Sequence, residues 1–238
     1  MPLEPPACQR RTRAECGSGA GRAPIRTRAL TASEATPTVP PAMTHDPRTS
    51  WIDVMPPEVA SPELAPLYAS VRATSTSGRV AHFWQSLSLA PRTLGAMHAM
   101  YATLWNDLAP LTRAQAEMIV VVVTALNGAA YCVSHHGPRL ADALQNDPLA
   151  RAIAKDYRTA NLPARDRVLL DHVVALTCEP SERTEADLAR LREYGYDDRA
   201  ILKATTLAAF YDMVSRIVTV LGVAIEPGRE HWEFGTQK

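Results

Sequence analysis

The chain has 238 residues, of which 46% are hydrophobic, so it is long enough to bury one substantial core. Its 25 Lys and Arg residues balance 25 Asp and Glu residues, which excludes a global field that would draw the protein to nucleic acid or an anionic membrane. No run approaches the roughly 18 apolar residues that a membrane-spanning helix needs. The cysteines are too widely spaced for the disulfide framework of a small secreted protein, which predicts reduced thiols in a cytoplasmic protein. They are Cys8, Cys16, Cys132 and Cys178.

Residues 1–50 differ in composition from the rest of the chain. They hold eight of the 19 prolines, seven arginines, no lysine and four acidic residues. With few large apolar side chains the segment cannot offset the entropy lost on ordering, so we predict a disordered extension. Its arginines are typical of an organellar transit peptide, but its prolines disfavour an amphipathic helix. We favour a dispensable extension before a functional start at Met43. A single helical domain is expected over 51–230, followed by a tail at 231–238.

The helices of this domain are marked by their first residues. Ser-Pro-Glu at 61–63 combines an N-cap, a first-turn proline and an early acid, and predicts a helix toward Arg72. Pro91 opens a second helix, which carries an apolar stripe. Later helices are predicted to begin near Cys132, Pro163, Glu185 and Asp198.

The segment from Thr112 to Gly128 is predicted to form the centre of the core. Thr112 and Gln115 have the spacing of a capping box, and Asn127 with Gly128 provides a helix end. The run Ile119–Thr124 is β-branched throughout, which is more typical of a buried strand. We predict a helix because its two ends define one unit and no other segment offers a strand partner. Such a helix must be surrounded by protein, so the fold is expected to be all-α.

Cys132 and His136 have a spacing that allows chemistry. Cys132 is placed in the first turn of a helix, where unpaired backbone N–H groups and the helix dipole stabilise a thiolate, so we expect a lowered thiol pKa. His136 follows four residues later, on the same helical face. This arrangement allows a cysteine activated by an adjacent general base. From spacing alone, a buried structural thiol beside a surface histidine is the more common alternative.

The stretch 113–140 resembles the signature of the alkylhydroperoxidase (AhpD)-like group of the carboxymuconolactone decarboxylase superfamily, most closely its peroxidase-related branch. That signature is a glutamate, eleven residues, Cys-x-x-Cys, three residues and a histidine. The matching positions are Glu117, Cys132 and His136, with Ala129 in place of the first cysteine. The likeness extends over about 51–230, including Arg167–Leu176, Thr184–Asp187 and Leu221–Val223. It implies an all-α, AhpD-like helical bundle.

The resemblance also implies a reaction. In that family the second cysteine attacks the peroxide, the histidine and glutamate form its proton relay, and the first cysteine resolves the sulfenic acid as a disulfide. This implies catalytic roles for Cys132, His136 and Glu117, but no resolving step, because Ala129 has no thiol. A sulfenic acid on Cys132 must then meet an external thiol, a thiol adaptor protein, Cys178 or a cysteine of the extension. For Cys178 we favour a structural role.

The sequence alone does not decide whether Glu117 can reach Cys132 to form this proton relay. Glu117 lies ten residues before Asn127, about 15 Å back along the helix axis, so a simple hairpin would keep it far from Cys132. A linker of five residues reaches about 17 Å, which permits the contact. The alternative is a first-turn acid that serves the helix dipole. His135 points about 100° away from His136 and is expected to face solvent or a neighbouring subunit.

Three functions follow as hypotheses. The first is a thiol-dependent peroxidase that reduces a small organic hydroperoxide with an external thiol, in a pocket lined by the valine-rich helix and the Met97–Leu104 stripe. The second is a lyase similar to carboxymuconolactone decarboxylase, in which histidine acid/base chemistry suffices. The third is a non-catalytic AhpD-like scaffold. No cofactor is expected. No metal is expected either, because structural zinc takes four ligands and Cys132, His135 and His136 have no second Cys/His pair nearby.

The resemblance further implies a homo-oligomer, with no nucleic-acid or membrane partner. An exposed stripe of Phe83, Trp84 and Trp105 could form its interface, although core burial is the alternative for each aromatic ring. Near the C-terminus, Arg216 lies four residues after Asp212 in an apolar helix, and we predict a salt bridge between them.

Overall fold

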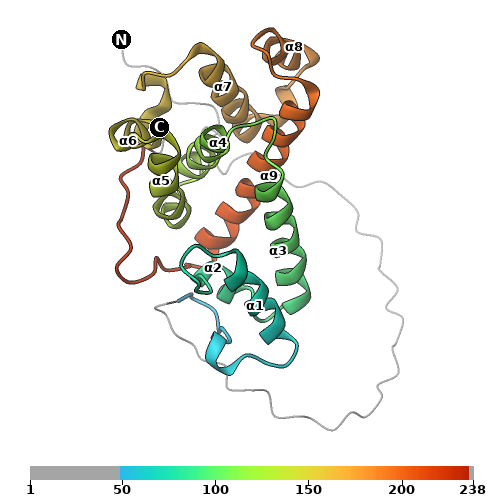
Figure 1. Ribbon diagram of the computed structural model, residues 1–238, viewed down its shortest axis with the longest axis vertical. Helices are drawn as coiled ribbons and strands as arrows, with labels where there is room; N and C mark the ends of the chain where they lie inside the picture. The colour runs from blue at the N-terminus through green and yellow to red at the C-terminus, as the bar shows by residue number, and fades with distance from the viewer. Residues whose placement is uncertain (1–48, 236–238) are drawn as a thin grey trace, which may run out of the picture.

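In the computed structural model, the described residues are 49–235, and they form a helical bundle without a β-sheet (Figure 1). The predicted all-α class is therefore confirmed for this part of the chain. The disordered extension predicted for 1–50 lies outside the described residues except for its last two positions. In chain order the helices are η2 (Pro57–Val59), α1 (Leu64–Thr74), α2 (His82–Ser86), α3 (Pro91–Asn106), α4 (Arg113–Leu126), α5 (Ala130–Leu144), α6 (Asp147–Asp156), η3 (Tyr157–Thr159), α7 (Ala164–Cys178), η4 (Pro180–Glu182), α8 (Glu185–Glu193) and α9 (Asp198–Val220).

Helix α4 forms the centre of the core, with α5, α6, α7 and α9 packed around it (Figure 1). Its side chains from Ala116 to Ala125 are all buried, as expected for a helix so apolar that it must be surrounded by protein. The capping box is present: the Thr112 hydroxyl accepts from the Gln115 backbone N–H, and the Gln115 side chain accepts from the Thr112 N–H. Gly128 ends the unit with a φ of +68°. The helical interpretation of the β-branched run is confirmed.

The other predicted starts agree with the structure to within two residues. Helix α3 begins at Pro91, α8 at Glu185 and α9 at Asp198, as expected, whereas α5 begins at Ala130 rather than Cys132. Two α-helices of the described residues were not anticipated: the five-residue α2, and α6, which follows α5 after a two-residue turn.

The segment after α9 returns along α5 to reach α6 (Figure 1). Trp232 is buried, and Gly137 on α5 leaves the space for its ring, since a Cβ atom at that position would overlap it. The Gly235 N–H donates to the Ala154 carbonyl at 3.2 Å. At the other end, the Ser50 hydroxyl donates to the Leu221 carbonyl at 3.1 Å. Packed structure therefore extends beyond both expected domain limits, residues 51 and 230.

The aromatic stripe expected at an oligomer interface is not exposed. Phe83 and Trp84 are buried and Trp105 is half-buried, because α2 and α3 turn these rings toward the core. The large apolar side chains that do reach the surface include Trp51 and Val220. No described helix is long and apolar enough to cross a membrane.

Replacing the cap of the central helix tests this account. Thr112→Ala removes the side-chain acceptor for the Gln115 N–H and should lower the free energy of unfolding by about 1 kcal/mol. In a domain of this size that corresponds to a melting temperature lower by roughly 3 °C, measured by circular dichroism. Thr103→Ala is the matched control, because its hydroxyl is exposed and bonds only within α3. Equal shifts for both variants would show that the Thr112 cap contributes nothing specific.

Candidate functional site

One face of α5 opens onto a cavity of about 540 Å³. Cys132, His135, His136 and Arg139 occupy positions i, i+3, i+4 and i+7 of this helix, so they lie on one stripe, and all four line the cavity. The rest of the wall comes from the end of α1, the α1–α2 connection, α2, α3, α9 and the segment after α9. The cavity is thus built from parts of the chain far apart in sequence.

Cys132 is the third residue of α5, as predicted, but its electrostatics differ from the expectation. Its side chain is only 3% exposed, and this burial raises the pKa of the thiol to about 12. The predicted lowering of the pKa is therefore wrong. The helix N-terminus favours a thiolate, but the cost of removing that charge from water is larger. At neutral pH the resting thiol keeps its proton.

Glu117 and His136 meet in the core. The Nδ1 atom of His136 lies 2.7 Å from Oε2 of Glu117, whose other oxygen accepts from Arg113 at 2.7 and 3.0 Å. The glutamate is fully buried, and the histidine ring is nearly so. Because α4 and α5 pack side by side, the contact needs no unusual linker. The carboxylate reaches the histidine rather than Cys132, which removes the geometric obstacle seen in the sequence.

The charges within this cluster follow from burial and from Arg113. Burial lowers the pKa of His136 to about 4, although the Glu117 carboxylate opposes the shift. Burial alone would raise the pKa of Glu117, but His136 and the guanidiniums of Arg113 and Arg139 outweigh it and lower the pKa. The ground state is therefore a carboxylate beside a neutral imidazole. Its Nδ1–H donates to Glu117, which leaves the Nε2 lone pair for the cavity.

Aromatic rings hold the His136 ring from two sides. Trp105 stacks on it at 5.7 Å between centroids with 16° between planes, and Tyr211 meets it edge-on at 4.9 Å. The two clamping residues are joined by a hydrogen bond of 3.0 Å from the Trp105 indole N–H to the Tyr211 hydroxyl. Arg113 covers the far face of this group, 4.3 Å from the Trp105 ring centroid. Sequence analysis missed these positioning residues, because they come from three different helices.

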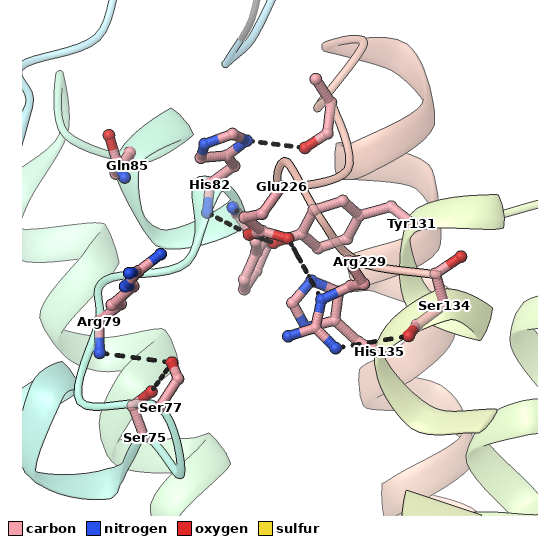
Figure 2. A network of polar contacts seen from close by, with 12 residues as sticks. Ser75, Ser77, Arg79, His82, Gln85, Tyr131, Ser134, His135, Glu226 and Arg229 are labelled. Atoms are coloured by element: carbon pink, nitrogen blue, oxygen red, sulfur yellow. Dashed lines mark hydrogen bonds and ion pairs between the residues drawn. The ribbon is translucent and has the colours of Figure 1, made fainter. Parts of the chain in front are cut away.

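A second carboxylate–histidine pair joins His135, the neighbour of His136 on α5, to Glu226 (Figure 2). Glu226, from the segment after α9, accepts from His135 at 2.7 Å, from the Tyr131 hydroxyl at 2.8 Å and from the His82 backbone N–H at 2.8 Å. Burial would raise the Glu226 pKa, but these donors hold it at about 2. Burial in turn lowers the pKa of His135. The expectation that His135 faces solvent or a subunit is wrong, because the returning segment covers it.

Other expected features have mixed outcomes. The valine-rich part of α4 does not line the cavity, because it is wholly enclosed by core, whereas Tyr101 of the Met97–Leu104 stripe does. Cys178 ends α7, a helix that contributes nothing to the cavity wall. The predicted Arg216–Asp212 pair is present at 4.0 Å. Within 49–235 no group of His, Cys, Asp and Glu side chains is arranged to hold a metal ion.

Solved structures place this fold among known proteins. A peroxidase-related protein from Silicibacter sp. TM1040 is 26% identical to the chain, with a TM-score of 0.70 over 79% of this chain and 97% of its own. A peroxidase-related protein from Ralstonia eutropha JMP134, described as an alkylhydroperoxidase AhpD core, is also 26% identical, with a TM-score of 0.69 over 75% and 93%. The debrominase Bmp8, solved with 2,3,4-tribromopyrrole, is 16% identical with a TM-score of 0.63 over 78% and 95%, which is a likeness of fold alone. No protein-family model and no curated protein match the chain.

The protonation state of His136 can be measured directly. Because its folded pKa is about 4, the ring should stay neutral from pH 8 down to pH 5, whereas a free histidine takes up its proton near pH 6.5. Nitrogen-edited NMR should show no titration in this window for the ring signal that disappears in His136→Asn. A midpoint near 6.5 would contradict the buried neutral imidazole. The same difference should lower the free energy of unfolding as the pH falls from 6.5 to 4, because the unfolded chain binds the proton first.

Proposed function

Since this chain is an AhpD-like protein similar to peroxidase-related proteins, we propose that it is a thiol-dependent peroxidase that uses Cys132 to reduce a small organic hydroperoxide. The observation that carries the proposal is the neutral, buried His136 held by Glu117 one helical turn from the only cysteine of the cavity wall among residues 49–235. Such a histidine is unprotonated over the whole physiological pH range, so its Nε2 lone pair is free to accept a proton, and Glu117 stabilises the imidazolium that forms.

Because the pKa of the Cys132 thiol is high, the first step has to remove its proton. Nε2 of His136 takes the thiol proton as the Cys132 sulfur attacks the outer oxygen of the hydroperoxide. The S–O bond forms while the O–O bond breaks, and the departing alkoxide receives the proton from the imidazolium. Glu117 stabilises the imidazolium formed in between, at no reorganisation cost. One hydroperoxide and one thiol thereby give one alcohol and one sulfenic acid, with every proton accounted for.

Recycling of Cys132 needs thiols from outside the cavity. One external thiol condenses with the sulfenic acid, releasing water and leaving a mixed disulfide. A second thiol then attacks that disulfide, which restores Cys132 and releases the oxidised reductant. Ala129 stands where a resolving cysteine would intercept the sulfenic acid, and it is buried at the N-cap of α5. The reductant is therefore a small thiol or a thiol adaptor protein.

A single-turnover experiment tests the proposal. Reduced protein mixed with one equivalent of cumene hydroperoxide should lose one thiol and give a sulfenic acid that dimedone traps on Cys132. Cys132→Ser should abolish the reaction, and His136→Asn should slow it roughly 100-fold, the usual effect of losing a positioned general base. Cys178→Ser is the matched cysteine control and should react at the wild-type rate.

The contrary outcomes point to different functions. A Cys132 that reacts no faster than a thiol in solution rules out the peroxidase. Turnover of a lactone acid that survives Cys132→Ser but not His136→Asn would indicate the lyase, which needs only proton transfer. Loss of both reactions in the wild type leaves the non-catalytic scaffold.

Restoring the absent thiol gives an independent prediction. In the Ala129→Cys variant the new thiol at the N-cap of α5 should capture the sulfenic acid, so each hydroperoxide should consume two thiols and dimedone should trap almost nothing. The wild type should consume one thiol and be trapped nearly completely. Thiol titration and intact mass measure both quantities. A variant that still accumulates trapped sulfenic acid would show that position 129 does not present its side chain to the sulfur.

A further inference from the structure

Among the described residues, one arginine of the cavity wall has no carboxylate in direct contact with it. Glu117 is paired with Arg113, and Glu226 lies 3.6 Å from Arg229. Arg139 has no such counterpart: within residues 49–235 no carboxylate lies at ion-pair distance from its guanidinium, and the groups that hold its pKa up are Tyr101, Glu117 and Tyr211. A partly buried cation without a carboxylate in direct contact has lost part of its hydration, and an anion that binds beside it compensates that loss.

The unpaired cation does not serve the nucleophile. Burial is the cause of the raised Cys132 pKa, and no nearby charge lowers it. Arg139 interacts electrostatically with Glu117, Tyr101 and Tyr211 instead. It lies seven residues after Cys132 on the same stripe, about 10 Å farther along the helix axis. Both side chains line the same cavity, so one bound ligand can contact the guanidinium and the sulfur.

The surface around Arg139 is aromatic. Tyr101 from α3 and Phe210 with Tyr211 from α9 line the same cavity, as do Phe83 and Trp84 from α2. These rings suit an apolar or aromatic ligand body. Arg79 lies at the exposed rim across from α5, together with the hydroxyls of Ser75 and Ser77 (Figure 2). Its charge adds to a field that favours anions entering the cavity.

We propose that this cavity is a binding site for an arylalkanoic carboxylate, whose carboxylate pairs with Arg139 and whose apolar body lies along the aromatic wall toward Cys132. Arginine suits this ligand because its planar fork binds a carboxylate through two parallel hydrogen bonds. Given the proposed peroxidase function, on which this part rests, the preferred substrate is a hydroperoxide that also bears a carboxylate, with its O–O bond at the end that lies toward Cys132.

Binding of redox-inert probes tests the site without any turnover. In titration calorimetry, reduced wild-type protein should bind 4-phenylbutyrate about tenfold more tightly than the neutral 4-phenylbutanamide, as expected for a charge-assisted contact. Arg139→Gln should reduce this ratio below twofold, and Arg139→Lys should keep part of it. Arg190→Gln, on the exposed face of α8, removes the same charge away from the cavity and should leave the ratio unchanged.

The affinities of the wild type and of the Arg139 variants can each overturn the proposed carboxylate site. Equal affinity of the wild type for the acid and the amide overturns the proposal, and this result does not depend on whether Arg139→Gln folds. A preference for the acid that survives in a folded Arg139→Gln variant also overturns it. Failure of the peroxidase is seen separately, as no oxidation of Cys132 by any hydroperoxide while the tenfold binding ratio persists. If both hold, a carboxylate-bearing hydroperoxide should oxidise Cys132 about tenfold faster than cumene hydroperoxide at low concentration, and Arg139→Gln should abolish the difference.

Discussion

The buried contact between Glu117 and His136 is the constraint on which the rest of the site depends. A carboxylate in the core of an all-helical bundle is tolerated only when its acceptor positions are filled, because an unpaired buried charge costs several kcal/mol. Arg113, at the surface, pairs with one carboxylate oxygen of Glu117, and His136, on α5, pairs with the other. The pairing fixes the packing of α5 against α4, and it also fixes the imidazole tautomer. Fold and chemistry are therefore set by the same hydrogen bond.

Burial then decides where charge is allowed. Cys132 and His136 are both neutral at rest, since desolvation raises one pKa to about 12 and lowers the other to about 4. The site is thus not a preformed thiolate–imidazolium pair. Under the proposed function, proton transfer and attack would occur together, which a bound electrophile of the right shape promotes. Protection of the resting thiol from adventitious oxidation follows from the same burial.

Helix α5 is enclosed on its other side by the end of the chain. Trp232 packs over Gly137, and Glu226 is carried back to His135 and the Tyr131 hydroxyl. The cavity wall is complete only because this segment folds back along the bundle. The solved peroxidase-related proteins share the helical fold at 26% identity, so the likeness covers the scaffold and does not extend to the particular residues that line the cavity.

Local sequence determined the helices that begin with a cap or proline, the burial of α4, and the placement of Cys132 and His136 on one helical face. These follow from periodicity and capping, which act over a few residues. Only the tertiary structure decided that Glu117 meets His136, that the thiol pKa rises rather than falls, and that Glu226 covers His135. The physical reason is that desolvation and ion pairing depend on which distant elements enclose a group, and no local pattern encodes that enclosure.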